Sequence, residues 1–292
     1  MKSGAKSIFK RDAERSTIRK MLLKYLIVAI VIYAAILLLL VIFETSIIYP
    51  APKYPAGNWV ASRHGATDVE FESADGTKLH AWYYEQDGAR GTLLFCHGNG
   101  EHVGYNGPYG ALLSRELNLN VLVFDYRGYG RSEGSPAKDG ILADGEAAIK
   151  WLAEKNGVTP GQVIVYGRSL GGAVACHLGA KHQVKGLFLQ STFSRMGDVA
   201  AGKYPIFPVK LLMRNRYDSV EYVRQYQNPL IHIHGDQDTV VPIHYGEVLF
   251  NAAASADKRF VRLSGLGHNN VSERVALNYL QPFVDNVFDP QE

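Results

Sequence analysis

Six apolar runs of strand length recur between residues 92 and 263, and this recurrence constrains the fold more than any other feature of the chain. Helix-like stretches lie between and after the runs. Runs that are apolar without a break predict strands buried on both faces, as in a parallel sheet covered by helices. The runs are TLLFC, VLVFDY, VIVYG, GLFLQ, LIHIHG and RFVRL. The sequence therefore predicts an α/β fold with a mostly parallel central sheet flanked by helices.

A hairpin precedes these runs. The segments DVEFES and KLHAWYYE flank Asp75-Gly76, which is a strong turn signal, so we expect an antiparallel edge on the sheet. Residues 194–229 are longer than a simple crossover and predict a short cap over the carboxyl edge, too short for a full lid domain. The aromatic side chains of this cap either line an apolar acyl groove or pack the cap onto the sheet, and both readings stay open. They include Tyr204, Phe207 and Tyr217.

The amino-terminal part of the chain has a different character. Residues 26–43 form a run of 18 without a charge, and about 20 apolar residues are enough to cross a bilayer. The run is longer than the apolar core of a cleaved signal peptide, and the ETSIIYP that follows offers no small-residue cleavage site. We expect an uncleaved transmembrane signal-anchor over residues 22–43. A cleaved signal peptide and a buried core helix are the alternatives.

The net charge of +3 is unevenly distributed. Residues 1–43 hold eight bases and two acids, whereas the rest holds 23 bases and 26 acids, a net charge of −3. Because basic residues beside a membrane span stay cytoplasmic, we expect a cytoplasmic tail over residues 1–21. A linker or extended entry segment over residues 44–66 and a catalytic domain over residues 67–288 should then lie outside the cytoplasm, in a periplasm or a lumen. The basic excess belongs to the tail, so no nucleic-acid partner is expected.

The chain has two cysteines, Cys96 in a predicted strand and Cys176 in a predicted helix. Neither lies in a spacing typical of zinc sites. We expect both to be small core residues, with a disulfide between them as the alternative.

Polar residues follow several of the predicted strands, at the edge where open α/β sheets bind ligands. A serine, two acids and a histidine occur in the order Ser…Asp…His, each just past a strand. They are Ser169, Asp236, Asp238 and His268; two other strands are followed by His97-Gly98-Asn99-Gly100 and by Arg127-Gly128. This constellation is more specific than any one motif within it.

Ser169 lies in a G-x-S-x-G pattern between a predicted strand and a predicted helix. Glycines two positions away on each side leave room for a sharp turn that exposes the serine hydroxyl at a helix amino terminus. The N–H groups of Leu170 and Asn99 should form an oxyanion hole. The alternative is that Ser169 only caps the helix.

His268 is the candidate general base, because histidine transfers protons near neutral pH and this one lies in a glycine-flanked loop after the last strand. Spacing alone does not choose between Asp236 and Asp238 as the acid that orients it. Asp125 and Asp144 are less favoured, and Asp125 is expected to tie the turn at Arg127. His97 is expected to orient its own turn rather than to react.

With these residues in place the chain resembles the α/β-hydrolase superfamily across about residues 66–285. The matching segments, in order, are HGNG, FDYRGYGRSEG, GRSLGG, HGDQDTVVP and GLGHNN. More narrowly, the chain is similar to the single-pass, membrane-anchored, lid-poor hydrolases of the serine aminopeptidase-like group, near which the depalmitoylating thioesterases belong.

The resemblance implies roles for particular residues. The last residue of the G-x-x-D pattern is Asp238, which the resemblance implies as the catalytic acid, and Asn99 corresponds to the oxyanion residue after the HG pair. Asn270 stands where members often have Asp after the His-Asn pair. No metal or organic cofactor is implied.

The sequence thus predicts a serine hydrolase that cleaves carboxylic ester or thioester bonds through an acyl-enzyme. A peptidase or amidase on the same triad is one alternative, and a non-catalytic, membrane-tethered binding module is another. A serine at the elbow disfavours epoxide hydrolases and dehalogenases, which use an aspartate nucleophile. An acylated lipid or an acylated protein near the membrane is the expected substrate.

Overall fold

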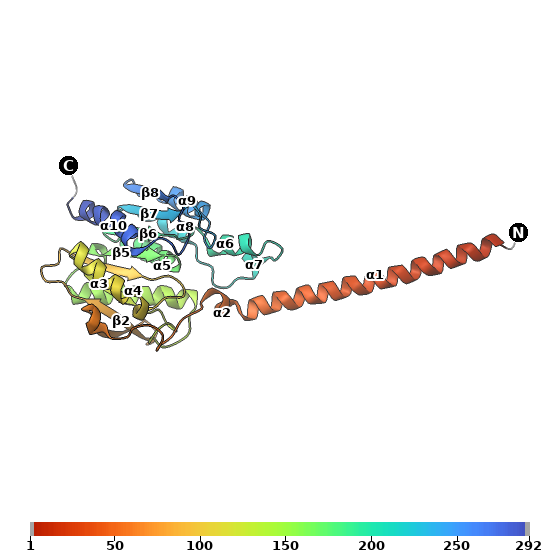
Figure 1. Cartoon of the computed structure of the whole chain (residues 1–292), viewed down its shortest axis with the longest axis horizontal. Helices are drawn as coiled ribbons and strands as arrows, with labels where there is room; N and C mark the ends of the chain where they lie inside the picture. The colour runs from red at the N-terminus through yellow and green to blue at the C-terminus, as the bar shows by residue number, and fades with distance from the viewer. Residues whose placement is uncertain (1–2, 290–292) are drawn as a thin grey trace. The chain divides into compact units, whose positions relative to one another are not determined.

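The computed structural model describes residues 3–289, and the side chains of residues 3–14 and 16 lie outside that description. The chain divides into two compact units, one up to Glu44 and one from Thr45 onward. The first unit is dominated by helix α1 (Ser3–Ile42), drawn in red and orange in Figure 1. The tail predicted over residues 1–21 falls largely on side chains outside the description.

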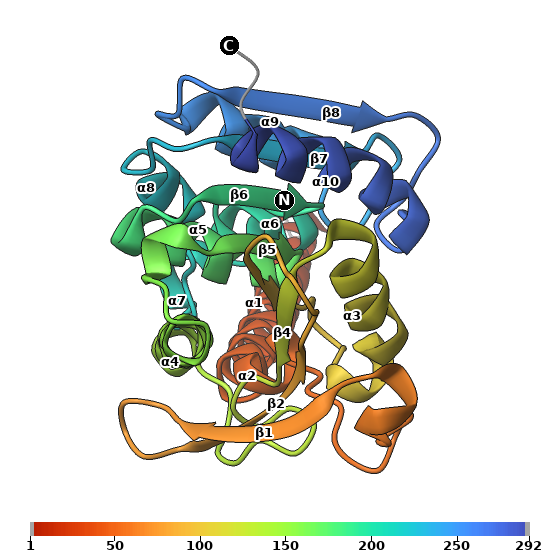
Figure 2. The ribbon, with the colours of Figure 1, turned by 90° about the vertical axis from the view of Figure 1, so that its left-hand side faces the viewer.

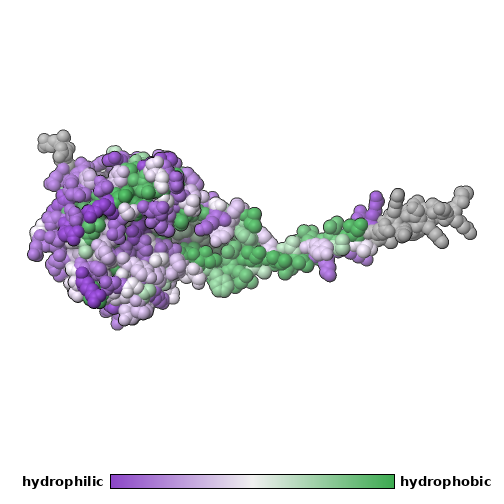
Figure 3. All heavy atoms as spheres, viewed as in Figure 1, coloured by the Kyte–Doolittle hydropathy of each residue, from purple (hydrophilic) through white to green (hydrophobic). Residues whose placement is uncertain are grey.

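Within the described residues, one helical stretch, Thr17–Ile42, is long and apolar enough to cross a membrane. Its most apolar window has a mean hydropathy of 3.2. The hydrophobic colouring along this part of α1 is evident in Figure 3. Such a helix fits a membrane anchor or a signal sequence.

The second unit is built on one eight-stranded sheet with the order β1-β2-β4-β3-β5-β6-β7-β8. Strands β3 to β8 run parallel, and β1 and β2 pair antiparallel at one edge. The strands are β1 (Thr67–Glu72), β2 (Lys78–Tyr84), β3 (Thr92–Cys96), β4 (Asn120–Phe124), β5 (Ile164–Arg168), β6 (Gly186–Gln190), β7 (Leu230–Gly235) and β8 (Lys258–Leu263). Both the predicted fold class and the predicted hairpin at the edge are confirmed.

Helices cover both faces of the sheet because successive strand residues point to opposite sides. Leu93 and Phe95 belong to the apolar cluster with helices α3 and α10, whereas Leu94 and Cys96 belong to the cluster with α4, α5 and α9. Figure 2 shows the two layers on either side of the strands. The helices of this unit are α2 (Glu44–Ile48), α3 (Val103–Leu117), α4 (Lys138–Lys155), α5 (Leu170–His182), α6 (Met196–Lys203), α7 (Val209–Leu212), α8 (Ser219–Val223), α9 (Ile243–Ala252) and α10 (Glu273–Phe288), with short 3-10 helices at Ala61–His64 and Pro160–Gln162.

The two cysteines, Cys96 and Cys176, are buried and carry free thiols in this structure. Each lies in the apolar cluster on the α4–α5 side of the sheet. Their place in the core agrees with the sequence expectation, and no disulfide joins them here.

The segment predicted as a linker, residues 44–66, is not a free connection from Thr45 onward. The Tyr49 ring is buried, and its hydroxyl lies 2.9 Å from the Tyr217 hydroxyl and donates to Asn215 Oδ1 at 3.1 Å. Farther along, Gly130 N donates to Pro52 O at 2.8 Å. The three prolines and the lack of a period gave this segment a linker's composition, but a buried tyrosine and backbone pairing attach it to the body.

The predicted cap over residues 194–229 is divided between two places. Helix α6 borders the site described below, whereas α8 packs against α5 and α9 in the layer that covers the sheet. Tyr204 lines the cleft at the site, but Tyr217 is 1% exposed and packs in the core. Of the two readings of the aromatic residues, packing therefore holds for Tyr217 and lining holds for Tyr204.

Candidate active site

The turn between β5 and α5 holds Ser169 in an uncommon backbone conformation. Its φ is 52° and its ψ is −115°, a region that a residue with a side chain rarely adopts. Two hydrogen bonds fix the residue there: Ser169 N donates to Gln190 O at 2.9 Å, and Thr192 Oγ1 donates to Ser169 O at 2.7 Å. The conformation presents the hydroxyl at the amino end of α5.

The glycines of G-x-S-x-G are required because the strand and helix approach closely. A Cβ on Gly167 would lie 2.5 Å from Gly171 O, and a Cβ on Gly171 would lie 2.0 Å from Cys96 O. Neither contact is possible for a real side chain. Both positions must therefore be glycine if α5 is to begin directly after Ser169, and the sequence expectation of a sharp turn is met.

Ser169, His268 and Asp238 form a continuous chain of polar contacts. His268 Nε2 lies 3.0 Å from Ser169 Oγ, and His268 Nδ1 lies 2.7 Å from Asp238 Oδ2. The other candidate acid, Asp236, instead accepts the backbone N–H of Gly265 at 2.8 Å. The structure thus brings together the three residues that the sequence placed after separate strands, and it separates the two acids of one loop.

The environment of Asp238 keeps its carboxylate charged. Burial on its own raises the pKa of this carboxyl, but hydrogen bonds from His234 and His268 outweigh burial and hold the pKa well below its usual value. Oδ1 also accepts the backbone N–H groups of Val240 and Val241 at 2.9 and 2.7 Å. A fixed, charged carboxylate of this kind can orient an imidazole and stabilise its protonated form.

His234 was not singled out from the sequence, although it lies four residues before Asp238 at the end of β7. Its Nε2 lies 2.8 Å from Val241 O and 3.3 Å from Asp238 Oδ2. It is fully buried and holds the loop that carries the acid. The spacing in HIHGDQD gave no signal for this contact, because the loop must fold back before the two side chains meet.

The two residues predicted for the oxyanion hole, Asn99 and Leu170, line the same cleft as Ser169. Within the described part of the chain, neither backbone N–H donates to another protein group. The Asn99 side chain is engaged elsewhere: its amide donates to Ile48 O, and its Oδ1 accepts from the Tyr129 hydroxyl at 2.6 Å. The side-chain bonds hold Asn99 in place and leave its N–H for a ligand.

A charge pair that the sequence analysis missed supports this loop. Arg168 contacts the carboxylate of Glu101, and the same carboxylate accepts Gly98 N at 3.1 Å. Burial on its own raises the pKa of Glu101, yet the Arg168 guanidinium outweighs it and leaves the pKa below its usual value. The pair ties the turn before Asn99 to the residue before Ser169. The partners are 67 positions apart, so only the folded chain shows the pair.

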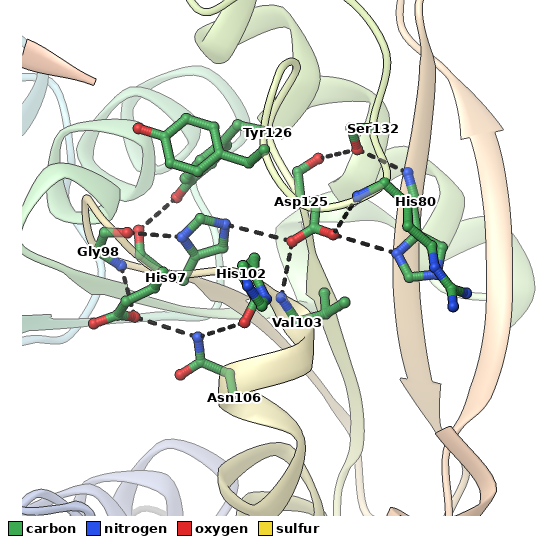
Figure 4. Close-up of polar contacts among 12 residues, drawn as sticks. His80, His97, Gly98, His102, Val103, Asn106, Asp125, Tyr126 and Ser132 are labelled. Carbon is green, nitrogen blue, oxygen red and sulfur yellow. Dashed lines mark hydrogen bonds and ion pairs between the residues drawn. The ribbon is translucent and has the colours of Figure 1, made fainter. Parts of the chain in front are cut away.

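A buried carboxylate, Asp125, organises the other side of the loop (Figure 4). Its Oδ1 accepts Val103 N at 2.8 Å, and its Oδ2 lies 3.3 Å from His80 Nδ1. His97, also fully buried, accepts at its carbonyl from Tyr126 and lies with Nδ1 2.8 Å from Gly98 O. His97 is therefore placed to orient its turn, as expected from the sequence.

Asp125 ties the turn that begins at Arg127, as expected from the sequence. Its Oδ2 accepts the backbone N–H of Arg131 at 3.4 Å, and its carbonyl accepts from Ser132 Oγ at 2.7 Å. The Arg127 side chain makes its own bonds to Asp144, including a contact of 2.7 Å from Nη2 to Oδ1, and to Asp75.

The cleft above Ser169 has a volume of about 360 Å³ and a mostly apolar lining. The apolar side chains come from three parts of the unit: residues 47–48, the segment 193–213 that contains α6, and the loop after β7. They include Ile47, Ile48, Phe193, Met196, Val199, Met213, Val240 and Val241. A second hollow of about 280 Å³ shares His268 and Asn269 with the cleft and is lined mostly by polar residues such as Gln237, Thr239 and Asn270.

Within residues 3–289 no group of three or more His, Cys, Asp or Glu side chains is arranged to hold a metal ion. The histidines near the site are instead engaged with carboxylates and carbonyls.

A family model for the alpha/beta hydrolase fold matches residues 91–219. An uncharacterized protein of Mycobacterium tuberculosis is 36% identical over 222 residues, which cover 74% of this chain and 78% of the relative. The chain belongs to the alpha/beta hydrolase family. The family also includes an alpha/beta hydrolase domain-containing protein of Arabidopsis thaliana, WAV2, which is 31% identical and covers 64% of this chain and 67% of its own.

Among other relatives, protein bem46 of Schizosaccharomyces pombe is 31% identical, and the match covers 69% of this chain and 70% of the bem46 chain. Among solved structures, an esterase of Pyrococcus furiosus matches with a TM-score of 0.67 and 19% identity, covering 82% of this chain and 97% of the esterase. At this identity the likeness shows the fold. Family membership and the esterase neighbours together support hydrolase activity for the alpha/beta hydrolase described here.

Proposed function

We propose that this alpha/beta hydrolase cleaves carboxylic ester or thioester bonds with Ser169 as nucleophile, His268 as base and Asp238 as the supporting acid. The observation that carries the proposal is the chain of contacts from Ser169 Oγ to His268 Nε2 and from His268 Nδ1 to Asp238 Oδ2, at 3.0 and 2.7 Å. Nucleophile and base within hydrogen-bond distance, with a third group orienting the base, are the requirement for an activated serine.

The proposed reaction has two halves. Ser169 Oγ attacks the substrate carbonyl as His268 Nε2 takes the hydroxyl proton, and the oxyanion that forms accepts from the N–H groups of Leu170 and Asn99. The intermediate collapses as His268 donates the proton to the leaving oxygen or sulfur. Water, deprotonated by His268, then attacks the acyl-enzyme, which releases the carboxylic acid and restores Ser169.

The cleft favours an acyl substrate over the alternatives. Its apolar lining suits a hydrocarbon chain, and a smaller polar hollow shares His268 with the cleft. The same triad serves amides, so a peptidase or amidase is the second candidate activity. A non-catalytic binding module would not need the strained backbone at Ser169, which the turn between β5 and α5 maintains.

A fluorophosphonate probe tests the nucleophile. We expect the wild-type chain to be labelled, Ser169→Ala to lose all labelling, and Ser62→Ala, an exposed serine outside the cleft, to be labelled like the wild type. Circular dichroism of each variant shows that the fold is retained. Absence of labelling on the folded wild type would overturn the proposal, and a p-nitrophenyl ester compared with the matching anilide separates esterase from amidase.

We propose further that α1 is an uncleaved signal-anchor, with the amino terminus in the cytoplasm and the body in the periplasm or a lumen. The support is the apolar stretch Thr17–Ile42 together with the eight basic residues that lie within residues 1–43. An acylated lipid or acylated protein at the membrane is then the natural substrate. Protease added to spheroplasts should digest the body. If the body is protected until the membrane is permeabilised, it lies in the cytoplasm and the proposed orientation is wrong.

A further inference from the structure

One part of the cleft lining comes from the segment that directly follows the apolar helix. Ile47 and Ile48 line the cleft together with Ser169, and both belong to the same compact unit as Ser169. The remaining apolar lining comes from α6 and from the residues around Met213 and Val241. A hydrocarbon chain bound above Ser169 would therefore contact residues 47–48.

The segment is held against the body and is not a loose tether. Ile48 O accepts from the side-chain amide of Asn99, whose backbone N–H is proposed for the oxyanion hole. The next residue, Tyr49, is 3% exposed and its hydroxyl lies 2.9 Å from that of Tyr217. The backbone N–H of Tyr49 closes a turn on Thr45 O at 2.8 Å. The turn from Thr45 to Tyr49 is thus closed on itself, and Ile48 and Tyr49 fix it to the body beside Ile47.

Covalent connectivity puts this wall close to the membrane. The apolar stretch ends at Ile42, five residues before Ile47. Five residues span at most about 18 Å, since an extended chain advances roughly 3.5 Å per residue. The headgroup layer of a bilayer is itself about 6 Å thick on each side. If α1 spans the membrane as proposed, the Ile47 wall lies in or just outside the headgroup region.

The surface near the cleft has the composition of a membrane-facing surface. Ile47, Ile206 and Leu211 are 48%, 73% and 74% exposed, and Figure 3 shows hydrophobic atoms on the surface over α6 and α7. Lys203, which lines the cleft, is exposed and makes no ion pair within the described residues. Exposed apolar side chains beside lysines are typical of segments that lie in a bilayer interface.

From these observations we propose that residues 45–49 form the acyl-chain wall of the active site, and that the site takes its acyl chain from a molecule resident in the bilayer. The inference rests on the proposed serine hydrolase activity and deepens it by naming the substrate class. The juxtamembrane segment then has two roles, because the same residues that connect the body to the anchor also select substrates with a long acyl chain.

The test uses the full chain reconstituted in phosphatidylcholine vesicles, with wild type, Ile47→Ser and Val248→Ser. Val248 is a matched control because it is 46% exposed, lies on α9 and does not line the cleft. Each protein is given p-nitrophenyl butyrate from solution, p-nitrophenyl palmitate dissolved in the vesicles, and palmitoyl-coenzyme A from solution. Fluorophosphonate labelling counts the active sites.

We expect Ile47→Ser to lower the palmitate-to-butyrate ratio of kcat/KM about tenfold and Val248→Ser to leave it unchanged, since a few buried methylenes account for a factor of this size. The wild-type chain should cleave p-nitrophenyl palmitate in the vesicles in preference to palmitoyl-coenzyme A in solution. Two results would overturn this inference and leave the proposed function standing. One is an unchanged palmitate-to-butyrate ratio of kcat/KM in an Ile47→Ser protein that is labelled and cleaves p-nitrophenyl butyrate. The other is a preference of the wild-type chain for palmitoyl-coenzyme A. Loss of labelling and of all ester hydrolysis in the wild type would instead overturn the proposed function.

Discussion

Ser169 shows how a single residue can be held where its intrinsic preference would not place it. A φ of 52° is unfavourable for serine, and the conformation persists because Gln190 O and Thr192 Oγ1 bind its backbone. Side-chain direction likewise decides which of two acids contacts His268. Asp238 reaches His268, whereas Asp236, two residues earlier, points to Gly265 N.

Substitution of the two acids provides a matched test of the triad. We expect Asp238→Asn to lower kcat on the order of 10⁴-fold, since an amide at this position favours the wrong imidazole tautomer. Asp236→Asn should leave kcat near the wild-type value because its partner is a backbone N–H outside the triad. Both rates are measured with p-nitrophenyl butyrate. Equal losses in the two variants would contradict the assignment of Asp238.

Between elements, close approach and ion pairing decide how α5 packs. Its first turn lies against β3, since Gly171 has Cys96 O and His97 O within 2.6 Å of where a Cβ would stand. Its last turns are tied to α4 by Glu146, whose carboxylate oxygens lie 2.9 Å from His177 Nε2 and from His182 Nε2 and form an ion pair with Lys181 Nζ at 3.0 Å. The helix that begins at the nucleophile is therefore fixed at both ends.

Gly171→Ala should prevent α5 from packing on β3. A Cβ 2.0 Å from Cys96 O cannot be relieved by a side-chain rotation, because the atom it meets is backbone. We expect little folded protein, with a loss of several kcal/mol in the free energy of unfolding. Gly197→Ala on α6 is the control: its nearest neighbour is Lys210 Cγ at 3.8 Å, so thermal unfolding should occur at an equal or slightly higher temperature.

The Glu146 tie should make stability depend on pH. Burial on its own raises the pKa of Glu146, but hydrogen bonds from His177 and His182 leave it below its usual value. A carboxyl with a lowered folded pKa contributes its full stability above its unfolded pKa, about 4.3, and loses it as the pH falls toward the folded value. Glu146→Gln should thus lower the free energy of unfolding by about 2 kcal/mol at neutral pH and by less in acid.

Urea unfolding at neutral pH and in acid measures the effect of Glu146→Gln. Glu154→Gln, at an exposed position on the same helix, serves as the control and should match the wild type at both pH values. A deficit in Glu146→Gln that grows as the pH falls would have the wrong sign and would contradict the ion-pair explanation.

At the scale of the whole molecule, the division after Glu44 predicts where the chain can be cut. A chain that begins at Thr45 lacks the apolar helix but keeps Ile48 and Tyr49 against the body. We expect it to move from the membrane pellet to the supernatant and to hydrolyse p-nitrophenyl butyrate at the wild-type rate per labelled serine. Its thermal unfolding should remain cooperative.

A longer truncation, beginning at Ala56, should behave differently. It removes the Ile48 carbonyl that Asn99 binds and the buried Tyr49 hydroxyl. We expect a lower unfolding temperature and a lower hydrolysis rate, since a large buried aromatic side chain and the support of the oxyanion loop are both lost. If both truncations behave alike, residues 45–55 are a linker after all.

Much of the architecture could be predicted because it depends on patterns of neighbouring residues. Unbroken apolar runs predicted the parallel strands, Asp75-Gly76 predicted the hairpin, and the glycines around Ser169 predicted the sharp turn. The prolines of residues 44–66 gave no signal for the buried Tyr49 within them. The Glu101–Arg168 pair was missed because no local pattern connects residues so far apart.

The sequence by itself determined the α/β fold, the order serine, acid, histidine along the chain, and an apolar helix at the amino terminus, since periodicity and composition report local burial. Only the tertiary structure decided which acid of one loop meets His268 and that Ile47 and Ile48 line the cleft. Such contacts join side chains that are distant in the chain, and their geometry depends on how the strands, helices and loops pack together.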